Sequence, residues 1–263
     1  MFFITTAQFP ISLSIKSNLQ TMLNIIAQVG ENELVVFPEG ALSGYDPDPN
    51  FLEQIDLGAL EWALGELQTA VSQKKIHLIF GSCLFEHRKW VNAGLYFSHN
   101  ATPFIYHKIN LATNERAHFQ AGATLSTFTL NVGKLHVTAG MQLCREIRFP
   151  EQWQHLARAG AQILFYLTNA VGDDAVLPVW RSHLISRAAE NQRFVIAANN
   201  AHIQQKCPTM IINPAGNVLA EVVSDKIATQ RTQIQLNQVS NWYLDQARMD
   251  VVGQSVDVKK SNC

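Results

Sequence analysis

Hydrophobic positions along the chain follow two different spacings. Uninterrupted apolar runs such as residues 34–37 (LVVF) and 163–167 (ILFYL) are typical of short strands covered on both faces. Within residues 19–26, apolar side chains instead recur at i, i+3, i+4 and i+7, the spacing of one helix face. By these criteria we predict helices at 19–26, 57–71, 150–160 and 177–188, and strands at 2–9, 34–37, 76–85, 91–98, 103–111, 126–130, 135–140, 163–167, 194–198, 209–212 and 218–222.

The order of these elements predicts the fold class. Strands and helices alternate near both ends of the chain, and the middle is rich in strands. This order is typical of a layered α/β domain with sheet inside and helices outside. Because no linker or low-complexity segment divides the chain, we predict a single domain over residues 1–263 with a more polar C-terminal tail from about residue 241.

Composition and charge narrow the possible functions. The chain is 47% hydrophobic and 16% charged, and its formal net charge of −1, without a long Lys/Arg run, predicts neither a nucleic-acid nor a membrane partner. No apolar run reaches the ~18 residues of a membrane span, and the start lacks the basic segment of a signal peptide. The four cysteines are far apart and have no zinc-like spacing. We therefore predict a cytoplasmic protein without a metal or other cofactor.

Chemically reactive side chains follow several apolar runs. Glu39 comes after LVVFP, Lys108 after FIYH, Cys144 after VTAGMQL and Asn169 after ILFYLT. Layered α/β folds usually build their sites at strand ends, and a carboxylate directly after a buried strand calls for an ion pair or a proton-transfer role. Each charged residue taken alone is more often a solvated strand end. Their combination points to a site.

Cys144 is predicted to lie at a strand-to-helix elbow. Ala139 and Gly140 in the preceding strand allow close approach of other backbone, and residues 149–151 (FPE) are typical of a first helical turn. Free backbone N–H groups and a helix N-terminus favour the thiolate over the thiol. The alternative is a buried structural cysteine, the commoner fate of a lone free cysteine.

Three of these residues suit one reaction. A thiol that attacks an amide or nitrile carbon needs a base to take its proton and return it to the leaving nitrogen. It also needs a cation or N–H group to stabilise the charge that develops on the former carbonyl oxygen. Glu39, Lys108 and Cys144 meet these needs without a metal.

Separated motifs strengthen this interpretation. From AQFP near the start to about Glu221, their order and spacing resemble the nitrilase superfamily, the carbon–nitrogen hydrolases with a Glu-Lys-Cys triad. The matching segments are FPEGALSGY, YHKINL, ERAHFQAG, CREIRFPE, GAQILFYLTNA, WRSHLISRAAENQRFVIAANNA and INPAG.

The resemblance implies a fold and a set of roles. It implies a four-layer α-β-β-α sandwich and a homodimer or higher homo-oligomer. It makes Glu39 the general base and acid, Lys108 the oxyanion stabiliser and Cys144 the nucleophile that forms a thioester. Glu115 falls where many members carry a second carboxylate that helps to hold the lysine, although from the sequence alone it could be an exposed loop acid. The backbone N–H of Arg145 would complete the oxyanion site.

The chain departs from the family pattern beside the nucleophile. Many members have an aromatic residue and then Asp after the cysteine, whereas Arg145 and Glu146 stand here. Arg145 could change the charge preference of the pocket, or it could face solvent. We expect Tyr45, Arg145, Asn169 and Trp180 to contact the substrate, although a core role for Trp180 is equally consistent with the sequence.

The resemblance implies hydrolysis of the non-peptide C–N bond of a small linear amide or an N-carbamoyl compound, with release of ammonia or an amine. True nitrilase activity, acyl transfer to an amine, and a catalytically silent binding protein of the same fold remain alternatives. A Cys-His site is disfavoured because no histidine has a suggestive setting. Asp173 and Asp174 would favour an amine-bearing substrate, although two loop acids usually face solvent.

Overall fold

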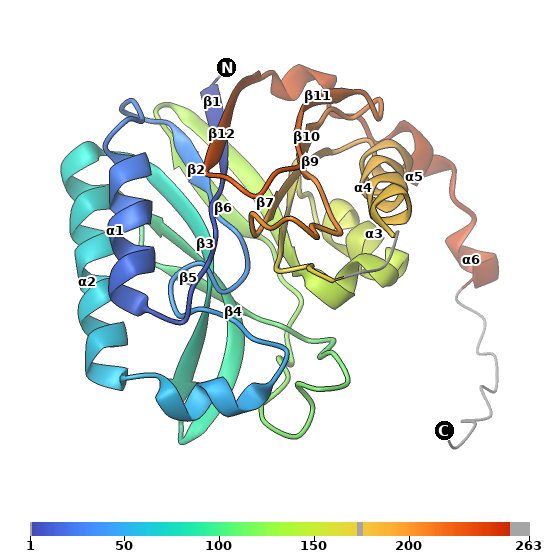
Figure 1. Ribbon diagram of the computed structural model, residues 1–263. Coiled ribbons are helices and arrows are strands. Elements are labelled where there is room, and N and C mark those ends of the chain that lie inside the picture. The colour runs from blue at the N-terminus through green and yellow to red at the C-terminus, as the bar shows by residue number, and fades with distance from the viewer. Residues whose placement is uncertain (1, 173–175, 253–263) are drawn as a thin grey trace.

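Two sheets stacked face to face form the centre of the computed structural model, which describes residues 2–172 and 176–252. Asp173 and Asp174 lie outside the described residues. Each sheet has six strands, and helices flank the pair on both sides (Figure 1). The predicted four-layer α-β-β-α sandwich is therefore confirmed.

The first sheet mixes parallel and antiparallel neighbours. β1, β2 and β3 are parallel, whereas β4, β5 and β12 pair antiparallel with their neighbours. In sheet order its strands are β12 (Ala228–Ile234), β1 (Phe2–Gln8), β2 (Leu34–Val36), β3 (His77–Glu86), β4 (Lys89–Ser98) and β5 (Phe104–His107).

The second sheet repeats this arrangement. β7, β8 and β9 are parallel, and β6, β10 and β11 are antiparallel to their neighbours. In sheet order its strands are β11 (Val218–Val222), β10 (Thr209–Ile212), β9 (Phe194–Asn199), β8 (Ile163–Thr168), β7 (Leu135–Leu143) and β6 (Phe128–Val132).

Helices cover the outer faces. The first sheet packs against α1 (Ile15–Ile26) and α2 (Leu57–Lys74), and the second against α3 (Pro150–Arg158) and α4 (Leu177–Asn191). Ser14 and Asp56 cap α1 and α2 by accepting hydrogen bonds from backbone N–H groups of the first turn. A third apolar cluster fills the space between the sheets. Strands buried on both faces explain the uninterrupted apolar runs of the sequence.

The structure differs from the prediction at two strands. No strand was predicted at 228–234 (ATQRTQI), yet this segment forms β12, which pairs with β1 from Phe2↔Ile234 to Gln8↔Ala228. It is mostly polar because it lies at a sheet edge, where alternate side chains meet solvent. The predicted strand 103–111 ends at His107, and the chain then turns into the loop that carries Lys108.

The C-terminal part packs beside the helices of the second sheet. Arg193 directly precedes β9. Its guanidinium group donates to the Ser240 carbonyl and to the Asn241 side chain. Arg158 donates to the Leu244 carbonyl at 3.0 Å. These bonds fix α5 (Trp242–Gln246), which precedes α6 (Met249–Val252). The remaining short helices are η1 (Pro49–Gln54), η2 (Cys144–Arg148) and η3 (Leu236–Gln238).

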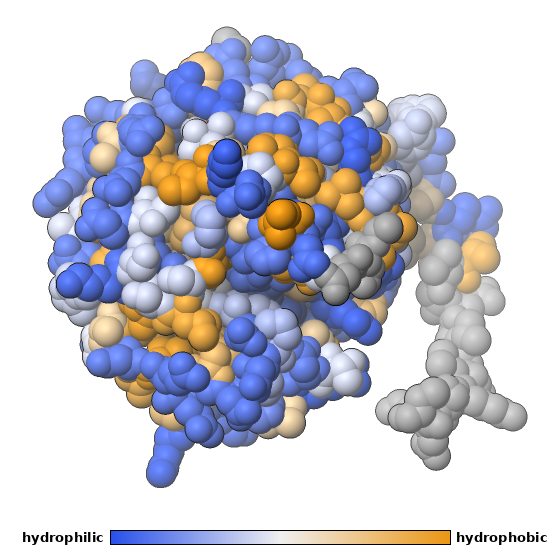
Figure 2. Space-filling view, in the orientation of Figure 1, coloured by the Kyte–Doolittle hydropathy of each residue, from blue (hydrophilic) through white to orange (hydrophobic). Residues whose placement is uncertain are grey.

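The face of the molecule that Figure 2 shows carries many hydrophilic side chains. On the face in Figure 2, apolar side chains form small groups that are separated by hydrophilic residues. Among residues 2–172 and 176–252, no helix has the length and apolar character that a membrane crossing requires.

Gly81 in β3 lets the chain after β2 cross the sheet closely. A Cβ atom at Gly81 would lie 2.4 Å from the Cα of Glu39 and 2.9 Å from the Pro38 carbonyl oxygen. The Gly81 N–H donates to that carbonyl at 2.9 Å. A backbone contact of this kind cannot relax by rotating a side chain, so Gly81 fixes the position of Glu39.

Gly81→Ala should lower the free energy of unfolding by about 1–3 kcal/mol, because the added methyl group overpacks the sheet against the Glu39 backbone. Gly65→Ala is the matched control. Its Cβ would meet no atom within 4 Å on the exposed face of α2, so it should raise stability by about 0.5–1 kcal/mol. Urea unfolding measures both, and equal effects of the two variants would contradict the role of Gly81.

Candidate active site

Strand ends from both sheets deliver the predicted reactive residues to one place. Glu39 lies three residues after β2, and Lys108 directly after β5. Cys144 follows β7, and Asn169 follows β8. The Asn169 N–H donates to Glu39 Oε2 at 3.0 Å, so the two sheets meet directly at this point.

Lys108 is shared by two carboxylates. Its Nζ lies 2.9 Å from Glu39 Oε1 and 2.9 Å from Glu115 Oε1. The exposed fraction is 0% for Glu39 and Lys108 and 1% for Glu115. Glu115 is therefore a buried member of the cluster, and the alternative of an exposed loop acid is wrong.

Asn92 completes the cluster, although it was not predicted as a site residue from the sequence. Its Nδ2 donates to Glu39 Oε1 and to Glu115 Oε1, both at 2.8 Å. Asn92 lies in the middle of β4 and is 1% exposed. The available signal was a polar residue inside the apolar run VNAGLYF, because a buried amide in a strand needs hydrogen-bond partners.

Glu115 is held by more than Lys108. Its Oε1 also accepts from the Tyr45 hydroxyl at 3.0 Å, and its Oε2 accepts from the Ala112 N–H at 2.5 Å. Burial pushes the pKa of Glu115 upward, but Lys108 and the hydrogen bonds outweigh it and lower the pKa below its usual value. Burial, Glu39 and Glu115 together raise the pKa of Tyr45, which keeps its hydroxyl a neutral donor.

Lys108 stays protonated despite its burial. Desolvation alone lowers the pKa of a buried lysine, but Glu39, Cys144 and Glu115 raise the pKa of Lys108 well above its usual value. The cluster therefore holds a fixed ammonium group between two anions.

Cys144 occupies a strained backbone conformation. Its φ is +40°, which non-glycine residues rarely adopt. The turn is held by the Tyr166 hydroxyl, which donates to the Cys144 carbonyl at 2.6 Å. The predicted elbow is present, but the turn η2 separates Cys144 from α3, which begins at Pro150.

Two effects in the structure oppose the thiolate that the sequence predicts at Cys144. Burial, followed by the charge of Glu39, raises the pKa of Cys144 to about 12. Lys108 lowers this pKa by less than the other two effects raise it. The helix N-terminus that was expected to stabilise a thiolate lies at Pro150, six residues beyond the cysteine. The site therefore needs a base to remove the proton.

Glu146 joins the cysteine turn to the lysine loop. Its Oε1 accepts from the Tyr106 hydroxyl and from the N–H groups of Ile109 and Asn110 at 2.8–3.0 Å. Its Oε2 accepts from the Leu143 N–H at 2.7 Å. Burial raises the pKa of Glu146, while these donors oppose the shift. The side chain thus ties the segments before Cys144 and after Lys108 to one fully buried carboxyl group.

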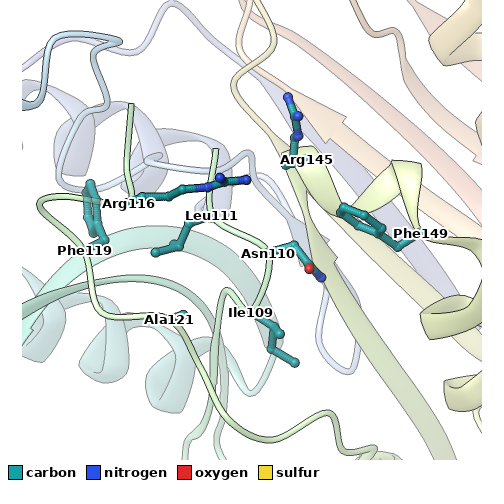
Figure 3. A pocket seen from close by; sticks show the side chains of 8 residues that line it. All are labelled: Ile109, Asn110, Leu111, Arg116, Phe119, Ala121, Arg145 and Phe149. Atoms are coloured by element: carbon teal, nitrogen blue, oxygen red, sulfur yellow. The ribbon is translucent and has the colours of Figure 1, made fainter. Parts of the chain in front are cut away.

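A pocket of about 390 Å³ lies beside these two segments. Arg145 and Phe149 reach it from the cysteine turn, and Arg116 and Phe119 from the loop on the other side (Figure 3). The remaining lining residues directly follow Lys108 or end the loop: Ile109, Asn110, Leu111 and Ala121.

The other predicted contact residues lie at different points. Tyr45 is part of the carboxylate cluster. The Asn169 side chain accepts from Asn200 at 3.0 Å, and its buried Nδ2 has no acceptor among the described residues. Trp180 does not line the 390 Å³ pocket. It packs against Tyr166, with ring centroids 6.3 Å apart, on the outer side of the second sheet.

Metal-binding side chains do not gather here. No group of three or more His, Cys, Asp or Glu residues suited to holding a metal occurs in the part of the chain that the structure describes.

Comparisons with known proteins agree on one family. The family profile described as "Carbon-nitrogen hydrolase" matches residues 3–243. An (R)-stereoselective amidase of a Pseudomonas species is 29% identical over 216 residues, which are 80% of this chain and 76% of that protein. A 2-oxoglutaramate amidase of Bacillus subtilis is 31% identical over 200 residues, 72% and 73% of the two chains. A probable nitrilase of Schizosaccharomyces pombe is 27% identical over 227 residues, 81% and 80% of the chains.

Solved structures share the fold. The amidase from Nesterenkonia sp. AN1, a cysteine-to-alanine mutant in complex with butyramide, has a TM-score of 0.81 at 20% identity and matches over 97% of both chains.

The protonation state of Cys144 can be measured directly. Thiolate ultraviolet absorbance, taken as the difference between the wild type and Cys144→Ser, should show no titration step below about pH 9. A raised pKa means that the thiol form dominates at every lower pH. A step near pH 6 would contradict the raised pKa and restore the thiolate expectation.

Proposed function

The chain belongs to the carbon–nitrogen hydrolase family and is an amidase-type enzyme for non-peptide C–N bonds, and from this premise we propose that it hydrolyses a small linear amide or an N-carbamoyl compound through a thioester on Cys144. The observation that carries this proposal is the buried Lys108, held 2.9 Å from both Glu39 and Glu115 at the strand ends that also deliver Cys144. A fixed cation and a carboxylate base beside a protonated thiol are the parts that thiol attack on an amide requires.

In the first half of the reaction, Glu39 takes the proton from Cys144 Sγ as the sulfur attacks the carbonyl carbon. The C–S bond forms, and the π electrons of the carbonyl move to its oxygen. Lys108 Nζ and the Arg145 backbone N–H stabilise that oxygen. Glu39 then gives the proton to the nitrogen, the C–N bond breaks, and ammonia or an amine leaves an acyl group on sulfur.

In the second half, Glu39 takes a proton from water as the water oxygen attacks the thioester carbon. The tetrahedral adduct collapses with cleavage of the C–S bond, and Glu39 returns the proton to the sulfur. The carboxylic acid leaves, and the thiol is restored. Glu115, with Tyr45 and Asn92, holds Lys108 in place throughout.

Amide hydrolysis is preferred to nitrile hydrolysis because two of the relatives carry amidase names, the (R)-stereoselective amidase and the 2-oxoglutaramate amidase. True nitrilase activity is the alternative, since another relative is named a probable nitrilase. A catalytically silent binding protein is the alternative of a different class. Measurable turnover of an amide or a nitrile would distinguish the amidase and the nitrilase from this binding protein.

Intact-mass measurement after mixing with butyramide should show a transient increase equal to the butyryl group, together with ammonia release. Cys144→Ala should lose both, with a fall in kcat of at least about 10³-fold, because the nucleophile is gone. Cys207→Ala is the matched control, since Cys207 is a buried free cysteine outside the cluster, and it should keep the adduct. Butyronitrile tests the nitrilase alternative, and an added amine that diverts the product tests acyl transfer.

Unchanged turnover in Cys144→Ala would refute the thioester mechanism. Faster ammonia release from butyronitrile than from butyramide would favour the nitrilase. The absence of turnover and of an adduct across a panel of amides and carbamoyl compounds would favour the silent binding protein.

We also infer a single domain over the whole chain, with a C-terminal tail from about residue 241, acting in the cytoplasm. Support for a reducing compartment comes from Cys83, Cys144 and Cys207, which are free thiols in the described chain. No nucleic-acid or membrane partner is proposed.

A homodimer or higher homo-oligomer completes the proposal. Trp242 and Tyr243 on α5 are 60% and 53% exposed, which favours a partner surface there. The molar mass from light scattering at micromolar concentration should correspond to at least a dimer. The double variant Trp242→Ser with Tyr243→Ser should shift this molar mass toward that of the monomer. Trp62→Ser, at a tryptophan on α2 that is 53% exposed, should have no effect. A wild-type monomer would contradict the proposal.

A further inference from the structure

The residues that line the pocket beside Cys144 and Lys108 carry positive charge and no negative charge. Its eight lining residues include Arg116 and Arg145, and they include no Asp or Glu. The two arginines come from different segments, Arg116 from the loop after Lys108 and Arg145 from the cysteine turn (Figure 3). The whole chain has a formal net charge of −1, so this local excess of cations is a property of the pocket and does not follow from the composition.

Both guanidinium groups are unpartnered in the described structure. Neither Arg116 nor Arg145 forms an ion pair or a side-chain hydrogen bond with residues 2–172 or 176–252. Other arginines of the chain are paired with carboxylates, namely Arg181 with Glu221, Arg187 with Glu190, Arg231 with Glu33 and Arg248 with Asp250. Two arginines that line one cavity and have no carboxylate partner therefore offer donors to an external ligand.

Asn110 adds an independent observation. Its backbone N–H is used by Glu146 at 3.0 Å, but its side-chain Nδ2 is buried and has no acceptor in the described structure. A buried N–H group without an acceptor costs free energy, so the position of Asn110 at this pocket is not explained by the contacts of the fold alone. The pocket thus presents two arginine side chains, and no carboxylate among its lining residues competes for them.

We propose that this pocket binds a carboxylate carried by the substrate, so that the enzyme prefers amides with a second, anionic end. The inference rests on the proposed function, because the bound carboxylate must belong to a molecule whose amide carbon reaches Cys144. Carboxylate oxygens accept bidentate hydrogen bonds from guanidinium groups, and a neutral or cationic chain leaves these donors unpaired. The carboxylate could lie on the acyl side, as in a monoamide of a dicarboxylic acid, or on the amine side, as in an N-carbamoyl amino acid.

The test compares matched substrates that differ in charge at one end. Glutaramate, its methyl ester and 5-aminopentanamide present a carboxylate, a neutral group and an ammonium group at similar distances from the amide. N-carbamoyl-β-alanine and its methyl ester form the second arm, and the better arm identifies the side that carries the carboxylate. Wild-type kcat/KM should be about 10- to 100-fold higher for the carboxylate than for its ester, mainly through KM.

Arginine variants then locate the effect. Arg116→Gln and Arg145→Gln should each reduce the ratio of kcat/KM for carboxylate over ester by about 10-fold. Arg116→Glu should shift the preference toward 5-aminopentanamide, which a merely structural role would not produce. Arg248→Gln is the matched control, because this exposed arginine pairs with Asp250 and does not line the pocket. It should leave the ratio of kcat/KM for carboxylate over ester unchanged.

Each outcome separates the two proposals. Equal wild-type kcat/KM for carboxylate and ester, or a preference for the ammonium compound, overturns the inference and leaves amide hydrolysis intact. Ratios that stay unchanged in both arginine variants also overturn it. If no substrate of any charge is hydrolysed and no acyl-enzyme forms, the proposed function fails and the inference fails with it.

Discussion

The ion cluster of Lys108 with Glu39 and Glu115 is the interaction on which the rest of the site depends. Burying three charges costs several kcal/mol per ion unless each is paired and hydrogen-bonded. Here every carboxylate oxygen has a donor, because Asn92, Tyr45 and the N–H groups of Ala112 and Asn169 join Lys108. These donors come from both sheets and from two loops. The four-layer fold is thus also the frame that holds the charges at fixed distances.

The net charge of this cluster opposes ionisation of the Cys144 thiol. One ammonium and two carboxylates leave a formal charge of −1, which opposes a second anion on sulfur and agrees with the raised pKa of Cys144. Moving the proton from Cys144 to Glu39 transfers a negative charge without adding one. The total charge beside Lys108 is then unchanged during the reaction, so the buried site need not solvate an extra charge at any step. A carboxylate base therefore suits this site.

The parts of the fold and site that follow from local pattern were predictable from the sequence. Apolar runs identified nearly all strands of both sheets, and the polar residues that end them identified Glu39, Lys108, Cys144 and Asn169. The edge strand β12 was not identified, because its polar alternation resembles a loop. Asn92 could not be assigned either, because its role depends on strand pairing between distant segments. The protonation of Cys144 depends on burial and on the charge of Glu39, which the sequence around Cys144 does not contain.

The two residues after Cys144 have different roles: Glu146 holds the backbone in place, and Arg145 lines the pocket. Glu146 is fully buried, and its carboxyl group accepts four hydrogen bonds that join the cysteine turn to the lysine loop. The extra methylene relative to the Asp of many family members is accommodated by these donors. Arg145, one position earlier in the same turn, is exposed and lines the pocket. Since the turn points consecutive side chains in different directions, a change at Arg145 can alter the choice of substrate without disturbing Glu146. The position of the nucleophile and the chemistry of the pocket can therefore vary separately within one five-residue turn.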